Sequence, residues 1–250
     1  ILGLTAETID EIQTIDYRTL LEAATKAQEE LKEEDINVRW GPTADGVVVM
    51  DEFVTTDIPV IVSGVFSESA VSSYKFGDFR HHEWDEAETT EKLEERFGDK
   101  ADELLAEFNK LYPEMEDREM YFYNNTMSGK WDIAAALTEL GNTVYLYEFD
   151  YESPVNGGIT AFHCEDLAFI FHNLDEPMVN IAYGEDPDAY KVQDAISNAF
   201  VALAYTGTPS TEELPWDAYE AGSHNLMKFN VESGCVDHDT TAYTEILNAE

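Results

Sequence analysis

An uninterrupted apolar run of strand length is the feature that most restricts how this chain folds. Residues 58–65 read IPVIVSGV, so apolar side chains fall on both faces of the corresponding strand. A strand of this kind has to be covered on both faces, as strands of parallel sheets are covered by helices. The run therefore predicts a buried strand. Helical segments before and after it in the sequence place the chain in the α/β class.

Apolar periodicity predicts the helices and the remaining strands. Gly98 divides one helical segment into two helices, while Asp186 and Pro187 have the residue types of an N-cap and a first helical position. No internal repeat interrupts the pattern, so we predict a single domain over residues 1–250. The predicted helices are 18–33, 88–111, 131–140 and 187–206, and the other predicted strands are 47–50, 143–151 and 226–231.

The charge balance excludes several classes of partner. The 250 residues include 53 acidic and 14 basic side chains, which gives a formal net charge of −39. Without a basic cluster we expect no nucleic acid as partner. The apolar runs are too short for direct insertion into a membrane. A surface this acidic is typical of salt-adapted proteins, so we expect a haloarchaeon or its virus as the source. An extracellular, cell-surface or virion location in high salt would follow.

Three groups of motifs follow one another along the chain. The first combines residues 41–46 (GPTADG) with the run at 58–65, the second combines 144–151 (VYLYEFDY) with 161–171 (AFHCEDLAFIF), and the third extends over 193–219. Together they resemble the C-terminal half of type-B carboxylesterases, the cholinesterase-like branch of the α/β-hydrolases. The resemblance implies half of an α/β-hydrolase fold, in which part of a mostly parallel sheet is flanked by helices and completed by another chain.

The same resemblance implies roles for a histidine and for an acid. In that family the loop histidine after the aromatic strand is the general base, and it corresponds to His163. The family's acid lies in a pattern G-V-x-x-D-E-G. An ungapped match aligns Ser69 with this acid and sets Glu68 one residue early. A serine cannot stabilise an imidazolium, so His163 and Glu68 are the candidate catalytic pair. An ordinary surface role for Glu68 stays open.

The usual setting of a serine nucleophile does not occur in this sequence. α/β-Hydrolases present the serine within G-x-S-x-G and form the oxyanion hole partly from an N-terminal glycine-rich loop. No two of the 14 glycines stand four positions apart, so this frame is missing. We therefore expect the chain to be inactive alone. We also expect a second polypeptide that supplies the N-terminal half of the hydrolase.

Two functions stay open on these grounds. The chain is either a non-catalytic binding, adhesion or structural module of a multi-chain assembly, or the histidine-donating subunit of a two-chain or nicked serine carboxylesterase. The serine at position 69 favours the first function, and the sequence around His163 favours the second. Either way, the exposed edge of a half-sheet makes a partner chain necessary.

The other candidate motifs predict no metal and no cofactor. His81, His82 and Glu83 are consecutive, and adjacent residues rarely converge on one ion, so this segment is predicted to be a loop. Cys164 and Cys235 permit one disulfide at most. The pattern that begins at Asn124 fits an N-glycosylation acceptor.

Overall fold

The computed structural model describes residues 1–38, 41–50, 52, 53, 55, 57–70, 78–184 and 186–249. The chain divides into two compact units, Ile1–Glu52 and Phe53–Glu250. Each unit has its own secondary structure, and the predicted single domain over residues 1–250 stays a prediction.

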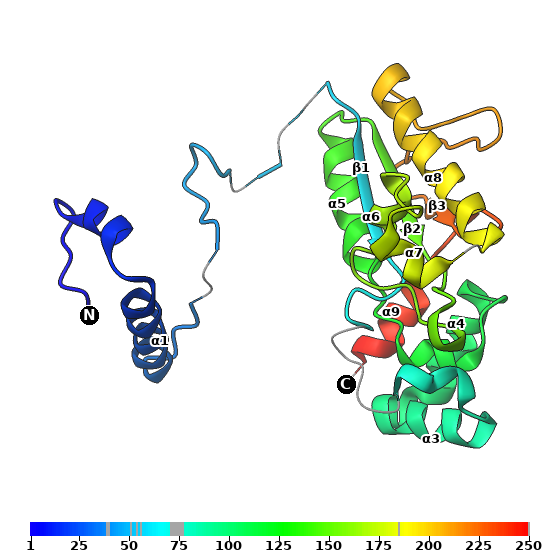
Figure 1. Ribbon diagram of the computed structural model, residues 1–250, viewed down its shortest axis with the longest axis horizontal. Helices are drawn as coiled ribbons and strands as arrows, with labels where there is room; N and C mark the ends of the chain where they lie inside the picture. The colour runs from blue at the N-terminus through cyan, green and yellow to red at the C-terminus, as the bar shows by residue number, and fades with distance from the viewer. Residues whose placement is uncertain are drawn as a thin grey trace. The chain divides into compact units, whose positions relative to one another are not determined.

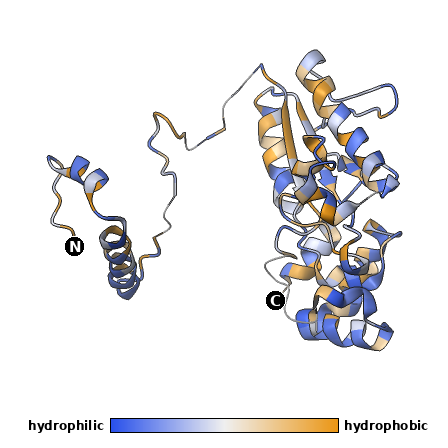
Figure 2. Cartoon of the chain, in the orientation of Figure 1, coloured by the Kyte–Doolittle hydropathy of each residue, from blue (hydrophilic) through white to orange (hydrophobic). Residues whose placement is uncertain are grey.

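The N-terminal unit contains helix α1 (Tyr17–Glu33), preceded by the 3-10 helix η1 (Ile9–Thr14). Asp16 begins α1, because its carboxylate accepts hydrogen bonds from the backbone N–H groups of Arg18 and Thr19 at 3.0 and 3.4 Å. The helix predicted at 18–33 is confirmed. Its surface is mostly hydrophilic (Figure 2), and Ala23 is its buried residue within the described unit.

The strand predicted at 47–50 is wrong. The carboxylate of Asp45 accepts hydrogen bonds from the backbone N–H groups of Val47, Val48 and Val49 at 2.9, 2.8 and 3.0 Å. An aspartate that bonds the following backbone in this way curls the chain into a turn. The valines are consequently left in solvent, with Val47 78% exposed and Val48 83% exposed.

The C-terminal unit holds a four-stranded sheet in the order β1-β2-β3-β4. The first three strands are parallel, and β4 runs antiparallel to β3. The strands predicted at 58–65, 143–151 and 226–231 are confirmed, as is a mostly parallel sheet flanked by helices. The strands are β1 (Val60–Val65), β2 (Val144–Phe149), β3 (Asn225–Phe229) and β4 (Gly234–Asp237).

The helices predicted at 88–111, 131–140 and 187–206 are confirmed, whereas the sequence pattern does not predict three shorter α-helices of this unit. Gly98 separates α3 from α4 with a φ of 60°, and Asp186 caps α8 by accepting the N–H of Asp188 at 3.0 Å. No helix in the described part of the chain is long and apolar enough to cross a membrane. The helices are α3 (Glu86–Phe97), α4 (Ala101–Leu111), α5 (Ser128–Glu139), α6 (Glu165–Ile170), α7 (Pro177–Tyr183), α8 (Pro187–Thr206) and α9 (Thr241–Asn248), with the 3-10 helices η2 (Asp78–Glu83), η3 (Gly98–Lys100), η4 (Asp117–Tyr121) and η5 (Val155–Gly157).

Helices cover both faces of the sheet, because the side chains of β2 alternate between two apolar clusters. Val144 and Leu146 belong to the cluster that includes residues of α5, whereas Tyr145 and Tyr147 belong to the one that includes residues of α8. Figure 1 shows α5 and α8 on opposite sides of the sheet. Each residue of β2 is buried as a result.

Strand β1 is one of the two edge strands of the described sheet, and β4 is the other. Val60 and Val62 pack against the cluster on the α5 side, and Ile61 packs against the other cluster, so both faces of β1 are covered as predicted. The first four residues of β1 are nevertheless only half-buried. The reason is the second edge of the strand, along which no described strand pairs.

Candidate active site

The loops that carry the candidate residues leave the sheet at one place. Strands β1 and β2 are parallel and end opposite each other, with Val65 beside Phe149. Beyond these ends the N–H of Ser67 donates to the carbonyl of Ala161 at 3.0 Å, and Ser67 and Phe162 form an isolated parallel bridge. The loop after β2 therefore returns alongside the segment after β1.

This bridge sets Glu68 and His163 side by side. Glu68 follows Ser67 by one residue and His163 follows Phe162 by one residue, so each candidate side chain lies in the turn that begins directly after the bridge. Atom Nδ1 of His163 lies 2.6 Å from Oε2 of Glu68, which is a hydrogen-bonding distance. The structure brings together the two residues that the sequence proposed as a pair.

The imidazole of His163 is turned to solvent. Its side chain is 70% exposed, and that of Glu68 is 39% exposed. Within the described part of the chain, no hydrogen bond engages Nε2 of His163. An imidazole held by a carboxylate at Nδ1 and open at Nε2 can take a proton from an incoming hydroxyl group.

Lys130 on α5 reaches the other carboxylate oxygen of Glu68. Its Nζ lies 3.6 Å from Oε1 of Glu68. The ammonium group passes over Gly64 of β1, where a Cβ atom would collide with it. A glycine at this position therefore leaves room for the cation, which offsets the negative charge of Glu68.

Asn124 fixes the turn that presents Glu68. Its Oδ1 accepts hydrogen bonds from the hydroxyl groups of Ser67 and Ser69 at 2.7 and 2.8 Å, and from the N–H of Ser69 at 3.1 Å. The side chain of Ser69 is thus bonded to Asn124, while Glu68 contacts His163. Asn124, the first residue of the predicted glycosylation pattern, is half-buried in this turn.

Buried acids support the loop of His163 from behind. Glu165 accepts the N–H of Phe162 at 3.1 Å and the hydroxyl group of Tyr183 at 2.7 Å. Asp166 accepts the hydroxyl group of Tyr147 at 2.6 Å. Burial raises the pKa of Glu165 to about 8, against the opposing effect of the two hydrogen bonds that it accepts.

Other groups that the sequence singled out lie outside this pair. Cys164 and Cys235 are both free and exposed. His81 is fully buried and its Nε2 lies 2.9 Å from Oε1 of Glu119, a contact between distant segments that the sequence analysis did not predict. Of the three adjacent residues 81–83, only His81 is buried and contacts Glu119. The three residues therefore do not form one site.

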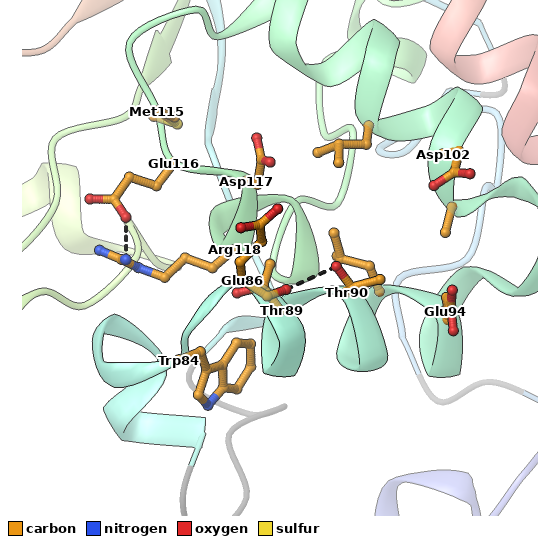
Figure 3. A pocket seen from close by; sticks show the side chains of 13 residues that line it. Trp84, Glu86, Thr89, Thr90, Glu94, Asp102, Met115, Glu116, Asp117 and Arg118 are labelled. Carbon is orange, nitrogen blue, oxygen red and sulfur yellow. Dashed lines mark hydrogen bonds and ion pairs between the residues drawn. The ribbon is translucent and has the colours of Figure 1, made fainter.

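A hollow of about 500 Å³ lies among the helices, away from His163 and Glu68. Figure 3 shows its lining, which includes Trp84 and the ion pair between Arg118 and Glu116. Neither member of the candidate pair lines it. The candidate pair is therefore not part of this hollow, and its exposed side chains lie where an incoming group can reach them directly.

The Carboxylesterase family profile matches residues 3–245. The para-nitrobenzyl esterase of Bacillus subtilis is 25% identical over 236 residues, which are 91% of this chain and 47% of that protein. A solved esterase from Clostridium hathewayi, described as hydrolysing aliphatic aromatic polyesters, has a TM-score of 0.82 at 25% identity and is matched over 98% of this chain and 50% of its own. A carboxylesterase from Geobacillus stearothermophilus has a TM-score of 0.59 at 22% identity, with 98% and 52% covered. The chain has an α/β-hydrolase-like fold and spans about half the length of these relatives.

Proposed function

Because this chain belongs to the carboxylesterase family, we propose that it supplies the histidine and the acid of a serine carboxylic ester hydrolase. The 2.6 Å contact between Nδ1 of His163 and Oε2 of Glu68 carries the proposal. The serine and the oxyanion hole come from a polypeptide segment outside these 250 residues, since the G-x-S-x-G frame does not occur within them.

In this proposal His163 moves the proton of the reaction. Its Nε2 accepts the proton of the serine hydroxyl while the serine oxygen attacks the ester carbonyl, and it then returns the proton to the departing alkoxide. In the second half-reaction Nε2 takes a proton from the water that attacks the acyl-enzyme, and returns it to the serine oxygen. Glu68 keeps the proton on Nδ1 throughout and stabilises the imidazolium, while it remains ionised itself.

The complementary segment pairs along the outer edge of β1 in this proposal. No described strand occupies that edge, and an unpaired edge presents a row of backbone N–H and C=O groups to any strand of suitable register. A second polypeptide at this edge would extend the sheet and bring its serine toward His163. The charge of −39 favours high salt as the setting of the assembly, because the chain repels itself at low ionic strength.

A non-catalytic binding or adhesion module is the competing function. Ser69 favours it, because an ungapped match puts this serine where the family has its acid. The contact between Glu68 and His163 favours hydrolysis instead, since it gives the imidazole an orienting carboxylate. The two functions differ in whether His163 matters for anything beyond local stability.

The test combines the full chain with a polypeptide that carries the N-terminal half of a related carboxylesterase, in high salt. We expect hydrolysis of a short-chain p-nitrophenyl ester by the assembly and by neither part alone. His163→Ala should lower kcat/KM by about 10⁴-fold or more. His172→Ala is the matched control, because His172 is also exposed and contacts a carboxylate, that of Asp194, at 2.9 Å.

The outcomes separate the two functions. Activity that survives His163→Ala would contradict the assignment of the general base. An assembly that forms with full stability and hydrolyses no ester would instead support the binding module.

A further inference from the structure

A second group of histidine and carboxylate side chains lies inside the C-terminal unit. His81 on η2 is 0% exposed and Glu119 on η4 is 6% exposed. Glu152, in the loop after β2, joins them, and one nitrogen or oxygen atom from each of the three residues lies within 4.8 Å of the other two. The group therefore collects three ligand-bearing side chains from three separate segments of the chain.

Glu119 keeps one buried oxygen free of hydrogen bonds. Its Oε2 accepts the hydroxyl group of Thr160 at 2.7 Å, which fixes the carboxylate. Its Oε1 is buried and accepts no hydrogen bond, although Nε2 of His81 lies only 2.9 Å away and Nε of Arg118 lies 3.9 Å away. Nε2 of His81 also lies 3.5 Å from Oγ1 of Thr160, so the imidazole and the carboxylate of Glu119 meet around one hydroxyl group, at a spacing from which both can reach one cation.

Glu152 is held against the backbone of the loop that follows it. Gly158 has a φ of +134°, and a Cβ atom there would collide with the Glu152 carboxylate, so the glycine provides the space for that carboxylate. Part of the side chain is exposed. Its carboxylate lies close to that of Glu119, and two carboxylates at this spacing repel each other unless a cation, such as Arg118 or a metal ion, lies beside them.

A cavity of about 360 Å³ adjoins the group and is lined by Glu119, Asp150, Glu152 and Thr160. Asp150 is 2% exposed, and neither of its carboxylate oxygens accepts a hydrogen bond, although Nζ of Lys228 lies 3.4 Å from Oδ2. Buried oxygens without hydrogen bonds call for an explanation such as an ion or ordered water. The cavity offers space for both.

We propose that His81, Glu119 and Glu152 bind one divalent transition-metal cation, for which Zn²⁺ is the best fit. One imidazole nitrogen with carboxylate oxygens is a donor set that zinc accepts, and water from the cavity completes the coordination. The cation joins η2, η4 and the loop after β2. Because the same loop continues to His163, the bound metal stabilises the segment that carries the candidate base without touching it.

The sequence-based expectation of no metal considered only runs of adjacent residues, among them His81, His82 and Glu83. The proposed site takes His81 from that run and the other two ligands from later segments. His82 is not a member of this ligand set, and its Nε2 lies 3.7 Å from Oε1 of Glu83.

The experiment titrates the chelator-treated full chain with Zn²⁺ by calorimetry, in high salt to weaken adventitious binding to the acidic surface. We expect one site with a Kd of about 1 μM or lower. Glu152→Gln should weaken it at least about 10-fold, because a neutral amide replaces a charged ligand. This variant keeps the fold, since part of the Glu152 side chain is exposed. His81→Ala should abolish the site, and circular dichroism monitors its folding.

A thermal measurement gives an independent outcome. Excess Zn²⁺ should raise the Tm of the wild-type chain by mass action and leave the Tm of Glu152→Gln nearly unchanged. His172→Ala removes an exposed histidine beside a carboxylate and should bind Zn²⁺ like the wild type. Equal affinity in wild type and Glu152→Gln, or an equal loss in His172→Ala, would overturn the proposal.

Discussion

Two histidine–glutamate contacts in this chain have similar lengths and opposite surroundings. His163 lies 2.6 Å from Glu68 with side chains 70% and 39% exposed, whereas His81 lies 2.9 Å from Glu119 with side chains 0% and 8% exposed. The exposed pair leaves Nε2 of its histidine open to a group from outside. The buried pair is surrounded by the unit that contains it. The same two residue types therefore suit proton transfer in one place and the binding of an enclosed ion in the other.

Their surroundings explain the difference. His163 follows a single bridge at the end of the sheet, where the turn held by Asn124 and the loop of Glu165 support it. His81 is packed among aromatic rings, with its ring centroid 4.7 Å from that of Phe122 and 6.0 Å from that of Trp84. Removing one partner costs little at an exposed ion pair and several kcal/mol at a buried one.

The largest expected effect concerns the acid of the exposed pair. In the proposed assembly with an N-terminal half, Glu68→Gln should lower kcat by about 10⁴-fold, because an amide cannot stabilise the imidazolium and favours the wrong tautomer of His163. Ser69→Ala, the matched control, should change kcat by less than about 10-fold, since the Ser69 hydroxyl bonds Asn124. Steady-state hydrolysis in high salt measures both. A larger loss of kcat for Ser69→Ala than for Glu68→Gln would contradict the assignment of Glu68 as the acid.

The next effect is a pH dependence that originates behind the exposed pair. Burial raises the pKa of Glu165 to about 8 from an ordinary 4.5, so between these values the folded chain holds a proton that the unfolded chain has lost. Stability should therefore fall as the pH rises through this window, by on the order of 5 kcal/mol from this residue at most.

Glu165→Gln removes this proton linkage. The unfolding free energy of the variant relative to wild type should rise between pH 5 and pH 8, as measured by urea denaturation of the assembly in high salt. The exposed Glu212→Gln serves as control and should show a difference that does not vary with pH. A parallel pH profile for wild type and Glu165→Gln would show that Glu165 does not titrate in this range.

The buried pair should dominate stability in the absence of metal. Glu119→Ala leaves His81 and the hydroxyl group of Thr160 buried without their carboxylate partner, so the unfolding free energy should fall by about 3 kcal/mol. Glu68→Ala removes the matching contact at the surface and should cost less than about 1 kcal/mol. Chemical denaturation with a chelator present compares the two variants. Similar losses of unfolding free energy in the two variants would show that burial does not make the His81–Glu119 contact more important for stability than the His163–Glu68 contact.

The smallest effect tests the cation beside the exposed pair. Lys130→Met should lower ester hydrolysis only a few-fold and change stability by less than about 1 kcal/mol, because its ion pair with Glu68 at 3.6 Å is partly solvated. Lys26→Met removes a similar pair with Glu30 at 3.7 Å in the N-terminal unit and should leave hydrolysis unchanged. A loss above about 100-fold would mean that Lys130 positions Glu68 rather than only offsetting its charge.

The sequence predicts most of the fold because apolar periodicity and caps are local signals. The division at Gly98 and the start of α8 at Asp186 and Pro187 depend on neighbouring residues alone. Strand β4 escapes prediction because it is short and three of its four residues are exposed. The valines at 47–50 mislead because one aspartate side chain satisfies their backbone N–H groups in a turn.

The candidate site is predicted less completely, because its contacts depend on loop register. A motif match identifies His163 but cannot decide between Glu68 and Ser69, since one residue of register separates them. The bridge between Ser67 and Phe162 decides the contact, and it involves two segments that are distant in the sequence. The group of His81, Glu119 and Glu152 has no local signal at all, because its members come from three segments.

The hairpin between β2 and His163 determines where homologous chains can differ in length without displacing His163. Ser153 and Ile159 form an antiparallel bridge that closes the tip of the loop. Codons added within the tip would lengthen the chain beyond that bridge and leave His163 opposite Glu68, although they would displace Gly158 from the Glu152 carboxylate. One codon added between Ile159 and Phe162 would instead shift His163 by about 3.4 Å along the pairing. Insertions in the tip can therefore disturb the position of Glu152 in the proposed metal site while sparing the contact between His163 and Glu68, so the two proposed properties can change separately.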